Sequence, residues 1–182
     1  MNGQRSEALA ALFAGDRERA ESLLPGEDRL SVFEAAAFGR AERLRALLAA
    51  DASQASERYE GFTPLHLAIF GGQAESCRIL IAHGADVNAR SSGEIARVPP
   101  LGTAAFVRST ELARLLLDAG ADVDGQGEGG FTALHTAAAN GDAELARLLL
   151  ERGADTSIRT GAGKLAADLA GDDAMRSLLS ES

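Results

Sequence analysis

Residues 61–68, Gly-Phe-Thr-Pro-Leu-His-Leu-Ala, decide the fold, because their central phrase returns at residues 132–135 as Thr-Ala-Leu-His. A second phrase keeps step with the first and reads ILIAHGAD at 79–86, LLLDAGAD at 115–122 and LLLERGAD at 148–155. The glycines of this second phrase lie 36 and 33 residues apart, and the histidines of the first lie 69 residues apart. Such a period predicts one supersecondary unit stacked on copies of itself.

The second half of each copy has the pattern of an amphipathic helix. Apolar residues recur there at i, i+3 and i+4, which is one face of a helix, in the sets Leu112/Leu115/Leu116, Leu145/Leu148/Leu149 and Met175/Leu178/Leu179. Thr63 and Thr132 stand where a helix should begin, and Ser31 with Glu34 forms a capping signature earlier in the chain. Each copy is therefore predicted to be a helix, a turn, a second helix and a projecting loop.

The combination of residues 61–68, Gly72 and the Gly-Ala-Asp-Val-Asn-Ala of residues 84–89 resembles an ankyrin repeat. This resemblance implies an all-α fold, an ankyrin-repeat α-solenoid of stacked helix-turn-helix units with projecting β-hairpin-like loops. We expect a single ankyrin-repeat domain over residues 1–182. Its parts are an N-terminal helix pair at 6–27, repeats at 28–59, 60–90, 91–125 and 126–159, and a C-terminal capping repeat at 160–182.

Charge and composition narrow the class of partner and the compartment. The net charge of -9 disfavours a nucleic-acid partner, because phosphate binding requires a clustered basic face. No apolar run is long enough to span a membrane, the first residues lack the apolar core of a secretory signal, and the single cysteine cannot form an internal disulfide. We therefore expect a cytoplasmic protein. One lysine among 18 basic residues, with abundant alanine, favours a GC-rich, bacterial genome.

Three features of the sequence resemble parts of nucleotide-binding, catalytic or metal sites, but none of them predicts an enzyme. The glycine-rich residues 125–130 follow no strand, and residues 160–164 lack the first glycine and the final Ser or Thr of a phosphate-binding loop. Cys77 aligns with small or apolar residues in the other copies, so we expect it to be buried and inert. His66 and His135 lie too far apart to share a metal, and we expect each to make an internal hydrogen bond. No catalytic residue, cofactor or metal site is predicted.

The resemblance places partner binding on the loop tips and on the concave face, which the first helix of each unit lines. Phe38, Phe70, Phe106 and Asn140 fall at first-helix positions that would face this groove, and Tyr59, Phe62 and Phe131 fall in the loops. A row of exposed large apolar side chains indicates a protein contact. The alternative is that the loop aromatics stack on neighbouring loops and that a shift of one position buries the others.

The third repeat departs from the period, and such departures mark candidate binding regions. Fifteen residues separate Gly84 from Pro99, whereas the equivalent distance is 12 residues at the other joints. Arg108 also replaces the glycine between the two helices. The basic and acidic residues of this region that we select as partner-binding candidates are Arg90, Glu94, Arg97 and Arg108.

The sequence therefore favours a noncatalytic adaptor or inhibitor-like module that holds another protein. The alternative is a homo-oligomer formed through the apolar concave stripe. A nucleotide-binding protein or an enzyme is a third and weaker reading, which an unchanged melting temperature with nucleotides or divalent metals would dismiss.

Overall fold

The structure is a computed structural model that describes residues 6–92 and 97–180. The fold is all-α, as predicted: 59% of the chain is helical, and the described residues form no strand. The chain groups into two compact units. The N-terminal unit comprises residues 1–59 and 63–85, and the C-terminal unit comprises residues 60–62 and 86–182. The bounds of the repeats, and their union in a single domain, stay predictions.

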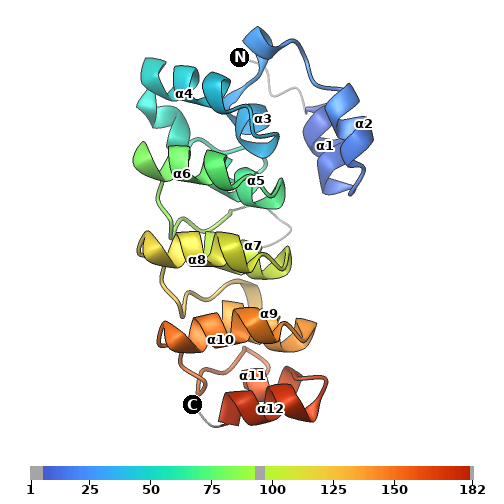
Figure 1. Ribbon diagram of the computed structural model, residues 1–182, viewed down its shortest axis with the longest axis vertical. Coiled ribbons are helices and arrows are strands. Elements are labelled where there is room, and N and C mark those ends of the chain that lie inside the picture. The colour runs from blue at the N-terminus through green and yellow to red at the C-terminus, as the bar shows by residue number, and fades with distance from the viewer. Residues whose placement is uncertain (1–5, 93–96, 181–182) are drawn as a thin grey trace. The chain divides into compact units, whose positions relative to one another are not determined.

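The N-terminal unit contains three helix pairs, which Figure 1 shows in blue to green. The helices are α1 (Glu7–Phe13), α2 (Arg17–Ser22), α3 (Val32–Ala37), α4 (Ala41–Ala50), α5 (Pro64–Phe70) and α6 (Ala74–Ala82), with short 3-10 turns η1 (Glu27–Arg29) and η2 (Ala52–Ser56). Helix α3 packs beside α5 and α4 packs beside α6, so two of the pairs stack in register. The first pair, α1 and α2, lies against the side of α3 and α5 that faces away from α4 and α6 (Figure 1).

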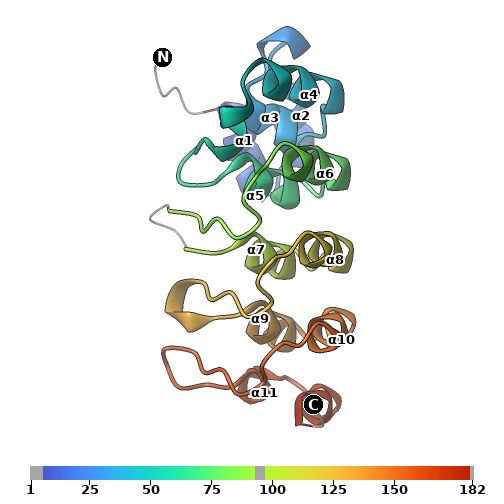
Figure 2. The same ribbon diagram turned by 90° about the vertical axis from the view of Figure 1, so that its left-hand side faces the viewer.

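The C-terminal unit repeats the same arrangement with three more pairs. They are α7 (Pro100–Phe106) with α8 (Thr110–Asp118), α9 (Ala133–Asn140) with α10 (Ala143–Glu151), and α11 (Ala166–Leu169) with α12 (Asp173–Ser180). Helix α9 lies between α7 and α11, and α8 packs on α10. Figure 2 shows that the loops that precede α9 and α11 project to the same side of this unit. The first of these loops contains the 3-10 turn η3 (Glu128–Gly130).

The helix starts follow the predicted capping residues. The side chain of Ser31 accepts a hydrogen bond from the Glu34 amide, and the Glu34 side chain accepts one from the Ser31 amide, which completes a capping box. Thr63 and Thr132 cap α5 and α9 in the same reciprocal way, each with a histidine three residues later as the partner. These bonds satisfy amide groups that a helix leaves without a partner in its first turn.

The histidines of these boxes are buried, as an internal hydrogen-bonding role requires. In His135 the Nδ1 atom accepts from the Thr132 amide at 3.2 Å, so the proton lies on Nε2. This Nε2–H donates to the carbonyl of Lys164 at 3.2 Å. The internal hydrogen bond predicted for His135 is therefore confirmed, and it connects the start of α9 to the loop that precedes α11.

The core of each unit is built from the apolar helix faces that the periodicity predicted. In the C-terminal unit, Leu145, Leu148 and Leu149 are at most 2% exposed, and Leu112, Leu116, Met175 and Leu179 are also buried. Cys77 is fully buried in α6 of the N-terminal unit, as expected. The glycines that follow the second helices, Gly84, Gly120 and Gly153, all have positive φ, which the end of a helix commonly requires.

Candidate functional site

The candidate site is sought among exposed side chains, where a protein partner would make contact. Within residues 6–92 and 97–180, no group of three or more histidine, cysteine, aspartate or glutamate residues could hold a metal ion. No helix among those residues has the length and apolar character needed to cross a membrane.

Two of the aromatic side chains predicted to line an open groove are covered. Phe38 is only 6% exposed, and the prediction that it faces solvent is wrong. Phe70 is half-buried, and its ring meets that of Phe13 edge-to-face with a centroid separation of 5.3 Å and an interplanar angle of 80°. For Phe70 the physical reason is the placement of the N-terminal helix pair, which puts Phe13 at the end of α1 against it.

The same helix pair also engages Tyr59. The amide of Ser6 donates to the Tyr59 hydroxyl at 2.8 Å, and the Ser6 hydroxyl donates to Glu34 at 2.7 Å. The Tyr59 ring packs on Phe33 with a centroid separation of 5.6 Å. Tyr59 therefore has a defined structural role within the N-terminal unit, and its proposed contact with a partner stays a prediction.

Phe106 is the most exposed large apolar side chain in the described chain. It ends α7 with 65% of its surface exposed, and Val107 beside it is half-buried. A phenylalanine of this exposure at a helix end keeps most of its apolar surface in water. Such a side chain is a candidate anchor for a protein contact.

Arg108 and Asn140 lie at the same edge of the C-terminal unit as Phe106. The Nη2 atom of Arg108 donates to the carbonyl of Asn140 at 3.0 Å, and the Nδ2 atom of Asn140 donates to the carbonyl of Ala105 at 3.4 Å. These two bonds connect the end of α7 to the end of α9. We call the set Phe106, Arg108 and Asn140 the α7–α9 edge; three of the predicted residues are thus brought together.

The loop candidates of the C-terminal unit are held by backbone contacts rather than by a cluster of side chains. Phe131 is 43% exposed, and its ring meets His135 with a centroid separation of 5.8 Å. The amide of Gly127 donates to the carbonyl of Phe131 at 2.7 Å, which closes the turn around η3. Phe131 therefore partly stacks on its own unit, as the alternative reading expected, and keeps an exposed part.

The other loop candidates do not join the α7–α9 edge. Arg90 and Arg97 are exposed, and Phe62 is half-buried. A Cβ atom on Gly127 would come within 3.1 Å of the Arg97 carbonyl, so the backbones of two successive loops lie in close contact there. Glu94 lies outside the described residues.

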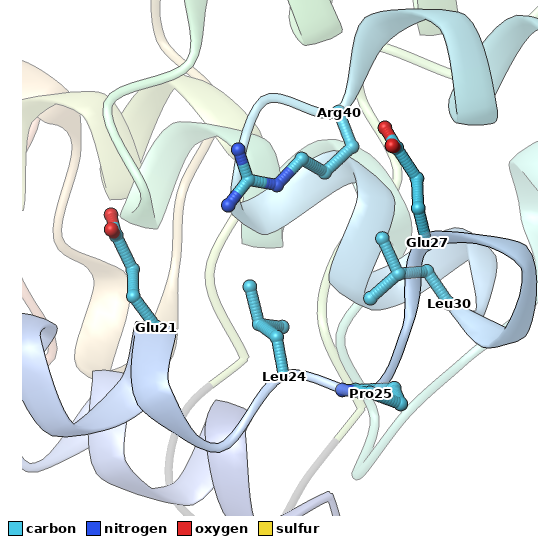
Figure 3. A pocket seen from close by; sticks show the side chains of 6 residues that line it. All are labelled: Glu21, Leu24, Pro25, Glu27, Leu30 and Arg40. Carbon is cyan, nitrogen blue, oxygen red and sulfur yellow. The ribbon is translucent and has the colours of Figure 1, made fainter.

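Sequence reasoning missed a shallow hollow in the N-terminal unit, because no motif marks it. The hollow has a volume of about 210 Å³, and Figure 3 shows its lining residues, Glu21, Leu24, Pro25, Glu27, Leu30 and Arg40. It lies between the end of α2, the segment that leads to α3 and the turn before α4, where Arg40 extends toward Leu24 and Glu21 (Figure 3). Its open form and mixed charges do not define a ligand.

Comparison with known proteins identifies the repeat units. Residues 8–91 match the family model described as "Ankyrin repeats (3 copies)", and residues 116–170 match the model described as "Ankyrin repeats (many copies)". A segment of 32 residues is 62% identical to part of Delta-latroinsectotoxin-Lt1a from Latrodectus tredecimguttatus. That similarity covers 18% of this chain and 3% of the length of the spider protein, so it bears on a single repeat-sized segment.

Proposed function

Because the chain belongs to the ankyrin-repeat family, whose members generally bind other proteins, we propose that it is a noncatalytic adaptor or inhibitor-like module. The observation that carries the proposal is the exposure of Phe106 at the α7–α9 edge. A partner that covers this ring removes a large apolar surface from water, which is the main source of binding free energy in protein interfaces. In this proposal, Arg108 and Asn140 supply the polar rim.

In this proposal the α7–α9 edge alone has the binding role that we predicted for the whole concave stripe. In the N-terminal unit the equivalent aromatic positions, Phe38 and Phe70, are buried or half-buried. A homo-oligomer that used a continuous apolar stripe would need those rings at the surface, so their burial disfavours this alternative. Binding through the loop tips, with Phe131, Phe62, Arg90 and Arg97, is the second way in which a partner could be held.

The test compares matched single substitutions in affinity capture from the lysate of the source organism. Phe106→Ala should abolish retention of the partner, whereas Phe131→Ala should leave it intact if the α7–α9 edge is the site. Arg114→Ala, which alters an exposed arginine on α8, is the surface control. If Phe131→Ala abolishes retention and Phe106→Ala does not, the partner binds at the loop tips and the proposed site is wrong.

Three further predictions from the sequence are part of this proposal. They are the cytoplasmic location, the bacterial source, and the four repeats at 28–59, 60–90, 91–125 and 126–159 with their flanking segments. Ankyrin-repeat proteins are typically noncatalytic, and the proposal follows that rule. A shift in melting temperature on addition of ATP, GTP or divalent metal would contradict the noncatalytic reading.

A further inference from the structure

The N-terminal helix pair covers a surface that the periodicity of the chain predicts to be open. Helix α1 runs along α3 and α5 on the side away from α4 and α6 (Figure 1). We call this surface, with Glu34, Tyr59, Phe70 and Gly71 at its ends, the α3–α5 face. It corresponds in sequence position to the surface of the C-terminal unit that carries the α7–α9 edge.

Hydrogen bonds connect both ends of the α1 segment to the α3–α5 face. At the start of the helix, the Ser6 hydroxyl donates to Glu34 and the Ser6 amide donates to Tyr59. Just past the end of the helix, Arg17 donates from Nη1 to the carbonyl of Gly71 at 3.1 Å.

The middle of α1 is apolar and ends in an aromatic ring. Ala8, Leu9, Ala11 and Leu12 are buried, and Phe13 meets Phe70 edge-to-face. In order along the chain, the segment therefore presents a hydroxyl, an apolar stripe, an aromatic ring and a cation. This is the layout of an amphipathic helix bound in a receptor groove.

We expect that a competing helix can displace α1 and α2 from the α3–α5 face. Helices α1 and α2 have 7 and 6 residues, the same lengths as α5 and α3, but α1 packs mainly on α2 and makes few contacts with α3. Release therefore breaks few contacts and returns conformational entropy to the chain. The connection to α3 contains Pro25 and the exposed Gly26, and it borders the open hollow of about 210 Å³. The Arg17 side chain is itself 54% exposed, so water can replace its bond to Gly71.

The helices beneath the pair have a much tighter core. Leu44, Leu48, Leu65, Leu67 and Leu80 are all at most 1% exposed. Helices α3 and α5 pack on each other, as do α4 and α6, without α1 or α2 between them. In the opened form α1 and α2 leave the α3–α5 face, and these two stacked pairs stay together.

We propose that the α3–α5 face is a helix-docking site which residues 6–17 of the same chain occupy in a closed state. A partner protein competes for it with a helix of the same chemistry: a hydroxyl cap, an alanine and leucine stripe, an aromatic residue at its end and an arginine four residues later. The inference rests on the proposed function, because it adds a second and masked surface to the module. Competition with α1 makes the apparent affinity depend on how often the face is open.

The test uses the full chain and a fluorescent synthetic peptide with the sequence of residues 6–22. Peptide binding is measured by fluorescence anisotropy to the native chain and to a Phe13→Ala chain, in which the intramolecular helix has lost its aromatic anchor. We expect the Phe13→Ala chain to bind the peptide about tenfold more tightly, since the lost ring contact and burial weaken the competitor. Glu18→Ala, an exposed change on α2, should bind as the native chain does.

Hydrogen exchange in the native chain provides the second readout. We expect the amides of α1 and α2 to exchange faster than those of α5 and α6, because the pair opens while the stack remains folded. Equal protection in all four helices would show that the pair is an integral part of the stack and would overturn the inference. Equal peptide affinity for the native and Phe13→Ala chains, or no binding to either, would overturn it as well.

The experiments distinguish failure of the masked site from failure of the proposed function. A chain that captures a partner through Phe106 but binds no peptide leaves the proposed function intact and removes only the masked site. A chain that binds the peptide after Phe13→Ala, and loses it when Phe70→Ala is added, has the masked site whether or not Phe106 holds a partner. Circular dichroism of each variant confirms that the helices are retained in these comparisons.

Discussion

Arg108 holds a left-handed backbone conformation, with φ of 57°, while its guanidinium donates to the carbonyl of Asn140 at 3.0 Å. The equivalent turns between helices have glycine at Gly39, Gly72 and Gly141, with φ between 65° and 71°. A residue with a Cβ atom is disfavoured there by roughly 1–2 kcal/mol. Backbone strain is often retained where a residue serves a function, so the strained Arg108 beside the exposed Phe106 supports a binding role for this edge.

Arg108→Gly should therefore raise stability and lower partner capture. The substitution relieves the left-handed strain and loses one exposed hydrogen bond, so we expect a net gain of about 0.5–1 kcal/mol in the free energy of unfolding. Urea denaturation measures the gain, and affinity capture measures the loss.

The matched control for this prediction is Arg147→Gly in the middle of α10. The same chemical change at a helical φ should destabilise the protein by about 1 kcal/mol, because glycine is a poor helix former. If both variants lose stability, then Arg108 contributes more through its contacts than its conformation costs.

Gly71→Ala should damage the N-terminal unit severely. A Cβ atom at this position would lie 1.9 Å from the carbonyl oxygen of Ala37, so α3 and α5 would have to move apart. We expect a loss of about 2 kcal/mol in the free energy of unfolding, as for other overpacked sites.

Gly26→Ala is the matched control for Gly71→Ala. A Cβ atom at Gly26 would meet no atom within 4 Å, and the backbone φ of -53° suits alanine. Its melting temperature should equal that of the native protein or slightly exceed it, because alanine restricts the unfolded chain. A Gly71→Ala protein as stable as this control would contradict the packing of α5 on α3.

Ser76→Ala should leave stability unchanged or raise it by about 0.5–1 kcal/mol. The Ser76 hydroxyl is fully buried in α6, and the described residues provide no hydrogen-bond partner for it. Removal of an unsatisfied buried hydroxyl eliminates its desolvation cost. Ser31→Ala serves as the contrast, since loss of its capping box should cost about 1 kcal/mol. A loss of that size for Ser76→Ala would reveal a partner for its hydroxyl.

The carboxyl of Asp51 should titrate below its ordinary range. The Ser53 hydroxyl donates to it at 2.6 Å and the Ser53 amide donates at 3.0 Å, and these bonds lower the pKa of Asp51 in that order of importance. Because the folded pKa lies below the unfolded value near 3.8, the stabilisation is complete above that value and is lost as the pH falls through the folded pKa.

Ser53→Ala tests this assignment. Loss of the hydroxyl removes the larger cause, so the pKa of Asp51 should rise toward its ordinary value, as read from the carboxyl carbon shift in an NMR titration. Asp155, whose pKa is lowered by Ser157 in the same way, should remain unchanged in this variant. A parallel rise at Asp155 would indicate global unfolding rather than a local effect.

Local features were predictable where the cause lies within a few residues. The capping boxes at Ser31, Thr63 and Thr132, and the positive φ of the glycines after the second helices, follow from requirements of a helix end. The burial of Cys77 follows from the small or apolar residues at equivalent positions. These predictions need only the repeat period and standard helix geometry.

The surface was less predictable, because the period does not determine where α1 and α2 pack. A pair placed in line with the others would have left Phe70 open, whereas the observed position puts Phe13 against it. The exposure of Phe106 agrees with its predicted position on the first helix of its repeat, although that repeat departs from the period at Pro99 and Arg108. One sequence feature could have indicated that the α3–α5 face is covered. Phe13 is an aromatic residue at the end of a stripe of alanine and leucine, which is typical of a helix that packs against another surface.

Binding of a partner at the α7–α9 edge is best measured by capture from the source lysate with the native protein and with Phe106→Ala, followed by mass spectrometry. We expect one protein that the native form retains and Phe106→Ala does not, at equal melting temperatures of the two baits. Retention of the same protein by both forms would show that the partner does not bind at this edge.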